Sequence, residues 1–246
     1  MTVENQENTQ PLSKTQLWGL ALSAILTEMN YDRHDVLDGG GDKQEALRAI
    51  RHILKRDWGI ETREALLRQI HRLLNGHGHG PGYRRLQHRL SAMSEAEMDA
   101  YIQRHQHDEE HHSELLIVRL NRFALDRTGI DAWDEGRSVN LCRWGMAVGM
   151  VGEEEGWDMI MSMARNAQQK YDSWYHFAIS YVVGRQYWRS LATEDFVNDQ
   201  MDILRRLTGN PESPWNTLDW HLPLDDVTAV IEVADKVRRA GVTDRS

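Results

Sequence analysis

Residues 131–145 read DAWDEGRSVNLCRWG, and this stretch decides the fold class. Two tryptophans, two arginines, three acidic residues and one asparagine fall within it, with no proline. Residues three and four positions apart share one face of an α-helix. Trp133, Arg137, Asn140 and Trp144 therefore form one stripe. The pattern predicts a helix that carries polar groups between aromatic anchors.

The rest of the chain also reads as helix. Only five of the 246 residues are proline, and no run alternates apolar and polar residues for long enough to indicate a strand. Further helices are expected at about 153–170, 173–190 and 194–207. The sequence predicts a mainly α protein, a compact multi-helix globular domain with little or no strand.

Capping patterns mark two helix starts. Ser13 with Gln16, and Ser94 with Glu97, have the spacing of a capping box. The first is expected to open a helix that ends at Asn30, and the second a long helix that continues past residue 116 and breaks at Thr128-Gly129.

The same signals divide the chain. The segment GHGHGPG at 76–82 reads as a loop because of its glycines and proline. The expected organisation is a disordered tail (1–13), an N-terminal helical unit (14–75), a loop with a short helix (76–93) and a C-terminal helical unit (94–240). The two helical units are expected to form one integrated domain over 14–240.

Composition narrows the class of protein. Hydrophobic residues make up 40% and charged residues 27%, which is typical of soluble globular proteins. No apolar run approaches the ~18–20 residues that cross a bilayer. The polar N-terminus and the single cysteine, Cys142, favour a cytoplasmic location without a disulfide or a membrane partner. The net charge of −9 makes nucleic acid an unfavourable partner.

A second stripe runs through the helix expected at 173–190, where Trp174, Tyr181, Arg185 and Trp188 share a face. If both stripes face the interior, Arg137 and Arg185 are partly buried and need acidic partners. The acidic residues nearest to them in the chain are Asp134 and Glu155. The candidate network or pocket is Trp133, Asp134, Arg137, Asn140, Trp144, Glu155, Trp174, Tyr181, Arg185 and Trp188. Such a network has two interpretations, a structural ion-pair cluster or a binding pocket.

Histidines concentrate in HQHDEEHH, residues 105–112. His107 and His111 have the i,i+4 spacing that lets one helix face hold a metal ion, and Glu109 with His112 has the spacing of a carboxylate-bundle motif. No third ligand and no second copy follow, so a solvated helix face is favoured. We therefore expect neither a metal nor a cofactor.

Motifs of nucleophilic catalysis and nucleotide binding are absent. The sequence has no G-x-S-x-G elbow, P-loop or dinucleotide-binding glycine pattern, and Cys142 lies inside an expected helix. Gly145 and Gly149, about one helical turn apart, are expected to let another helix approach closely.

Five blocks carry a resemblance to a known family. They are WGLALSAILTEMN (18–30), WGIETREAL (58–66), WDEGRSVNLCRWGMAVGMVGEEEGWDMI (133–160), YDSWYHFAISYVVGRQYWR (171–189) and SPWNTLDW (213–220). In order and spacing the chain resembles the bacterial family called domain of unknown function 1266 over about residues 17–220. The resemblance implies a helical, soluble bacterial protein and brings no activity or catalytic residues.

Three functions are compatible with these observations. The favoured one is a cytoplasmic protein-interaction module whose partner is another protein, with Trp215 and Trp220 as anchors; alternatively, these rings only pin the C-terminal segment to the bundle. The second is a small-ligand-binding protein or enzyme that uses the candidate network. The third is an effector or its neutralising partner in bacterial competition.

Overall fold

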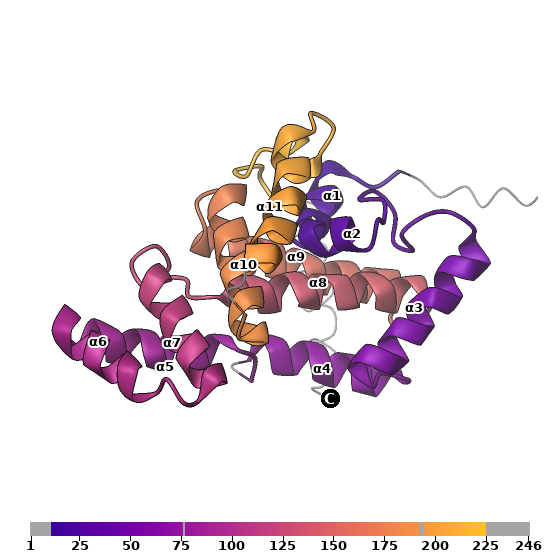
Figure 1. Cartoon of the computed structure of the whole chain (residues 1–246). Helices are drawn as coiled ribbons and strands as arrows, with labels where there is room; N and C mark the ends of the chain where they lie inside the picture. Colours follow the sequence, from indigo (N-terminus) through magenta and orange to yellow (C-terminus); the bar gives the residue numbers. More distant parts are fainter. Residues whose placement is uncertain (1–10, 76, 192–193, 225–246) are drawn as a thin grey trace, which may run out of the picture.

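The structure is all-helical. The computed structural model describes residues 11–75, 77–191 and 194–224, and every regular element in these residues is a helix (Figure 1). The helices are α1 (Lys14–Ala21), α2 (Ala24–Met29), α3 (Lys43–Trp58), α4 (Arg63–Leu74), α5 (Gly80–Ser91), α6 (Glu95–Arg104), α7 (Glu109–Asn121), α8 (Asp131–Ala147), α9 (Glu153–Lys170), α10 (Trp174–Arg189), α11 (Glu194–Gly209) and α12 (Pro214–Thr217). The predicted fold class is confirmed.

Helix α8 lies at the centre of the molecule. It packs against α1, α2, α4, α9 and α10, which leaves it no solvent face (Figure 1). Every residue from Ala132 to Met146 is buried. A helix covered on all sides cannot segregate its charges to a wet face, so each charged side chain on it needs a partner inside the protein.

The predicted helix caps are present. Ser13 and Ser94 each accept a hydrogen bond from the backbone N–H three residues later, and both form complete capping boxes. Gly59 ends α3 in the left-handed conformation, with φ of 64°, which glycine adopts without a steric penalty.

Two predicted helices are interrupted. The first breaks between α1 and α2. There the hydroxyl and the backbone N–H of Ser23 both donate to the carbonyl oxygen of Leu20, three residues earlier, instead of continuing the α-helical pattern. The long helix expected from Ser94 ends at Arg104. A new helix then starts because the side chain of Asp108 caps the backbone N–H of His111.

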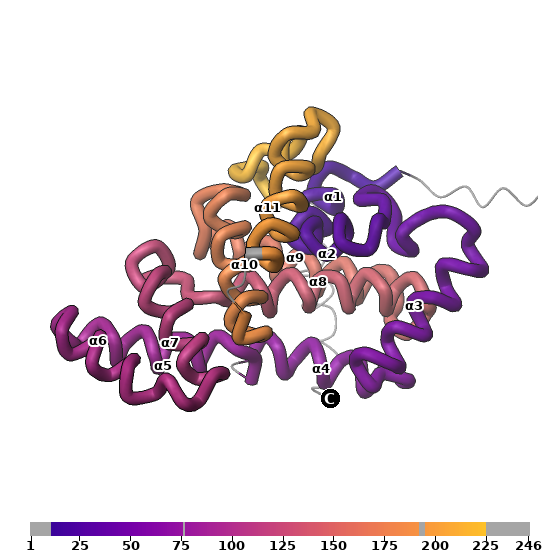
Figure 2. The backbone as a smooth tube through the Cα atoms, in the orientation of Figure 1, coloured from indigo at the N-terminus to yellow at the C-terminus, as the bar shows by residue number. Residues whose placement is uncertain are grey.

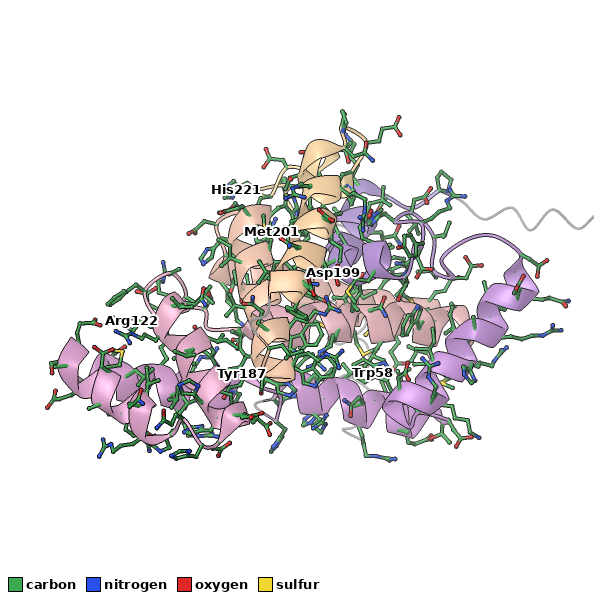
Figure 3. All side chains as sticks on the ribbon, in the orientation of Figure 1. Trp58, Arg122, Tyr187, Asp199, Met201 and His221 are labelled. Atoms are coloured by element: carbon green, nitrogen blue, oxygen red, sulfur yellow. The ribbon has the colours of Figure 1, made fainter. Side chains whose placement is uncertain are left out.

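The core consists of two hydrophobic clusters. The main cluster joins α1–α4 to α8–α12, so it draws on residues from both ends of the described chain. The second holds α5–α7 against Val183 and Tyr187 of α10. Figure 2 shows α5–α7 as a group at one end of the molecule. Tyr187 lies where α10 meets that group, and Arg122 lies within it (Figure 3).

Four indole rings fasten the C-terminal segment to the bundle. Trp174 stacks on Trp215 with 5.9 Å between ring centroids, and Trp18 and Trp220 pack against Trp174. The indole N–H groups of Trp18, Trp174, Trp215 and Trp220 donate to the carbonyls of Asp219, Leu218, Ala21 and Tyr171, respectively. Trp215 and Trp220 are only 6% and 5% exposed, so the expectation that they are surface anchors is corrected: their rings fill the core.

None of the helices in the described ranges has the length and apolar character that crossing a membrane requires.

Candidate functional site

The first turn of α8 opens onto a cleft of about 500 Å³. Asp131, Asp134 and Glu135 lie on one face of that turn because they are three and four residues apart. The remaining walls come from α4, the start of α5 and one side of α9. The polar residues that line the cleft are His71, Asn75, Arg84, Asp131, Asp134, Glu135, Ser162, Asn166 and Lys170.

Glu135 is the least satisfied carboxylate in the cleft. Its side chain is buried, and its Oε1 atom accepts a hydrogen bond of 2.5 Å from Nζ of Lys170. Its Oε2 atom has no hydrogen-bond partner. Burial raises the pKa of Glu135, and the charge of Lys170 only partly opposes the shift.

Asp131 connects this pair to α5. Lys170 lies 3.4 Å from Oδ2 of Asp131, and Arg84 donates to the same oxygen. Gly80 packs against Asp131 so closely that a Cβ atom at Gly80 would lie 2.6 Å from its Oδ1 atom.

Asp134 is held from two sides. Arg137 donates to its Oδ1 atom, and the backbone N–H of His79 donates to Oδ2 over 3.0 Å. A Cβ atom at Gly78 would lie 2.0 Å from Oδ2, so glycine is required for this approach. Burial alone would raise the pKa of Asp134, but the hydrogen bonds from His79 and Arg137 and the charge of Arg137 outweigh it and lower the pKa.

Arg137 is walled by indole rings. Its guanidinium carbon lies 4.3 Å from the ring centroid of Trp133 and 5.6 Å from that of Trp58. With 7% of its surface exposed, it is a buried cation paired with Asp134. At Asp134 and Arg137 the structure thus has the ion pair beside tryptophan rings that the sequence indicated.

Glu155 and Arg185 do not belong to that ion pair. Glu155 accepts from Arg63 at 2.6 Å on the surface, so its expected pairing with a stripe arginine is corrected. Arg185 is half-buried beside the ring of Phe196, and no ion pair joins it to a carboxylate in the described part of the chain. The hydroxyl of Tyr181 is within electrostatic range of both Arg137 and Arg185.

The remaining stripe residues separate into different environments. Asn140 and Trp144 are buried on α8, and Trp174 belongs to the indole cluster described above. Trp188 is 45% exposed, with its ring 5.5 Å from that of Trp133. The two stripes therefore meet only in part.

Arg143 is a buried cation that the stripe missed. Its guanidinium is fully buried and donates to the carbonyls of Leu37 and Arg33 and to the hydroxyl of Thr27. These bonds attach the loop between α2 and α3 to the centre of the molecule. Arg143 lies off the stripe, as do Glu135 and Lys170. For Arg143 and Glu135 the signal was charge on a helix that offers no wet face, whereas Lys170 is an exposed residue at the end of α9.

The histidine cluster is divided between a turn and a helix. His107 lies in the turn between α6 and α7 and His111 on α7, so the expected shared helix face is corrected. His111 pairs with Glu114 at 3.3 Å. Glu109 and His112 lie in the first turn of α7, and no group of three metal-binding side chains occurs among the residues that the structure describes.

Gly145 and Gly149 play different roles. A Cβ atom at Gly145 would lie 2.4 Å from Leu66, so α4 approaches α8 closely there, as expected. Gly149 has φ of 76° and no atom within contact of such a Cβ, so the expectation of close packing is wrong there and the glycine serves the turn after α8.

Comparison with known proteins identifies a family. The family model described as "Protein of unknown function (DUF1266)" matches residues 53–220, more than half of the chain. The uncharacterized protein YbeR of Escherichia coli K12 is 27% identical over 179 residues, which cover 68% of this chain and 75% of YbeR. The uncharacterized protein YbeU of the same strain is 29% identical over 142 residues, 58% of this chain and 59% of YbeU. No solved structure shows significant similarity to the chain. The chain therefore belongs to the DUF1266 family of proteins of unknown function.

Proposed function

We propose that the protein binds a small amphipathic amine in the cleft at the first turn of α8. The observation that supports this most directly is the unpaired Oε2 atom of Glu135, a residue that lines that cleft. A buried carboxylate oxygen without a donor is costly, and a ligand that supplies an N–H group removes the cost.

The charges around the cleft favour a cationic head group. Lys170 and Arg84 already have carboxylate partners, so neither offers an uncompensated positive charge to an anion. Glu135 shares a single lysine with Asp131 and keeps one acceptor. An ammonium group satisfies that acceptor with a charge-assisted hydrogen bond.

Part of the cleft wall is apolar. Its walls carry Leu67, Ile70 and Leu74 of α4, and Met159 and Met163 of α9. A volume of about 500 Å³ falls in the range of small-molecule sites, roughly 300–1,000 Å³. A ligand with a short hydrocarbon portion next to its amine fits this division of polar and apolar walls.

The test is an NMR titration of the ¹⁵N-labelled full chain with hexylammonium, hexanol and hexanoate. Hexylammonium is expected to shift the amide signals of Leu67, Met163 and Asn166 most strongly. Glu135→Gln removes the negative charge with little change in shape, and is expected to weaken hexylammonium binding about tenfold, the effect of one charge-assisted hydrogen bond.

The matched control is Glu110→Gln, an exposed glutamate in the first turn of α7. It should leave the titration unchanged. Tighter binding of hexanoate than of hexylammonium, or an equal loss in both variants, would reject the proposal.

A protein-interaction role is the second candidate, with a different surface from the one expected. Leu120 and Phe123, at the end of α7, are 79% and 75% exposed, whereas Trp215 and Trp220 are buried. Exposed apolar groups of this size favour contact with another protein. Sedimentation velocity tests self-association: Leu120→Ser should weaken it, and Tyr175→Ser, which changes an equally exposed ring on α10, should not. A cytoplasmic location remains a prediction that cell fractionation would test.

A further inference from the structure

A second hollow lies between α2, α10 and α11, with a volume of about 370 Å³. It is separate from the cleft at α8: the two share no lining residue. Three polar side chains in its wall, Arg185, Asp199 and Gln200, have no ion pair or hydrogen bond to another group in the described part of the chain.

Arg185 supplies an uncompensated positive charge. Its guanidinium lies 5.1 Å from the ring of Phe196 and is half-buried. Burial lowers the pKa of Arg185, and the charge of Asp199 opposes this effect without forming an ion pair with it. A guanidinium keeps its charge at all ordinary pH values and presents a planar fork of donors that matches a carboxylate.

Gln200 supplies a polar group in the wall of the same hollow. Its side chain is 1% exposed, and neither its amide nitrogen nor its amide oxygen has a hydrogen-bond partner. Buried amides in folded proteins are nearly always satisfied, so two unpaired atoms on one buried side chain point to a missing partner.

The other charged residues in the wall are already paired. Glu28 accepts from Arg206 at 2.8 Å and lies 2.9 Å from His34, and Asp202 pairs with Arg205. Asp199, an exposed residue on α11, is the acidic group in the wall without such a partner among the described residues (Figure 3). The hollow thus offers one cation, one anion and one neutral amide.

From this juxtaposition we propose that the hollow binds the zwitterion of a free α-amino acid. The carboxylate pairs with Arg185 and accepts from the amide of Gln200, and the ammonium group faces Asp199. Met29 and Ile203 line the same hollow and provide apolar surface for the side chain of the ligand. The site does not depend on the amine-binding function proposed above, because it uses different residues.

The test is an NMR titration of the ¹⁵N-labelled full chain with L-leucine, isovalerate and isoamylammonium. The two analogues keep the branched hydrocarbon and carry only the carboxylate or only the ammonium group. The expected result is that L-leucine binds most tightly, isovalerate about tenfold more weakly and isoamylammonium not measurably, with shifts at Ile203 and at the side-chain amide of Gln200.

Arg185→Gln is expected to abolish binding of both carboxylates. Arg189→Gln is the matched control, because Arg189 lies one turn further along α10 and is exposed. It should change nothing. Asp199→Asn should weaken L-leucine about tenfold and leave isovalerate unchanged, which separates recognition of the ammonium from that of the carboxylate.

Circular dichroism melting of each variant distinguishes loss of a site from loss of the fold. No shift with any probe at 20-fold molar excess, or equal losses for Arg185→Gln and Arg189→Gln, would overturn the proposal. It would also be overturned if Arg185→Gln and Asp199→Asn lowered the melting temperature equally and no probe bound, because the two residues would then serve only as a structural pair.

Discussion

The ammonium group of Lys170, at the end of α9, lies 2.5 Å from Oε1 of Glu135, near the start of α8. The pair joins two helices across the cleft, and one partner is buried while the other is 42% exposed in its side chain. A carboxylate held in this way depends on its single cation, because no donor reaches its second oxygen.

Replacing Lys170 with methionine is therefore expected to destabilise the protein. The change leaves Glu135 buried without its cation, at a cost of about 1–3 kcal/mol once the exposure of the lysine is discounted. Urea denaturation measures the loss. The double variant Lys170→Met/Glu135→Gln should recover most of it, and equal stabilities of the single and double variants would contradict the assignment.

Arg143 is expected to be the more costly arginine to replace. Arg143→Met removes hydrogen bonds to Thr27, Arg33 and Leu37 and leaves two part-buried carbonyls without this donor, which predicts a loss of about 3–5 kcal/mol in the free energy of unfolding. Hydrogen exchange should speed up selectively in residues 31–41. Arg51→Met, which changes an exposed arginine with one long bond to a backbone carbonyl, should cost less than about 0.5 kcal/mol.

Stability should depend on pH through Asp134. Its pKa is lowered in the folded protein, so ionised Asp134 contributes stability above its unfolded pKa of about 3.9, and that contribution is lost as the pH falls through the folded pKa. Asp134→Asn should flatten the acid limb of a plot of unfolding free energy against pH below about pH 4.

Glu135 should change the stability with pH in the opposite direction. Its raised pKa means that the folded state holds its proton more strongly, so its contribution to stability falls as pH rises above the unfolded value of about 4.3. The difference in unfolding free energy between Glu135→Gln and the wild type should therefore favour the variant more at pH 7 than at pH 4. Identical pH profiles for wild type and both variants would show that neither carboxylate is perturbed.

Gly136 is expected to tolerate no side chain. A Cβ atom there would lie 2.7 Å from the ring of Tyr181 and 2.8 Å from the carbonyl oxygen of Leu22, and a backbone atom cannot move aside cheaply. Gly136→Ala should lower the unfolding free energy by about 1–3 kcal/mol. Gly209→Ala, at the end of α11 with no atom near its Cβ, should be neutral or stabilising by up to about 1 kcal/mol. Equal effects of the two changes in thermal melts would contradict the close packing at Gly136.

The sequence alone determined the helical class and several helix boundaries. The capping serines at 13, 94 and 173 and the glycine at 59 act on neighbouring backbone groups, so their effect depends only on nearby residues. It missed the break at Asp108, where a side chain caps a new helix inside a stretch whose apolar spacing is still helical.

The tertiary structure decided which charges meet. Glu155 pairs with Arg63, 92 residues away, and Lys170 reaches Glu135 across 35 residues, whereas the pair Asp134–Arg137 is local enough to be read from spacing. The indoles at 215 and 220 could equally have been exposed, and their burial depends on carbonyl acceptors in α1 and after α9. Helical period fixes a residue's neighbours within about one turn, but partners on other helices follow from how the helices pack around α8.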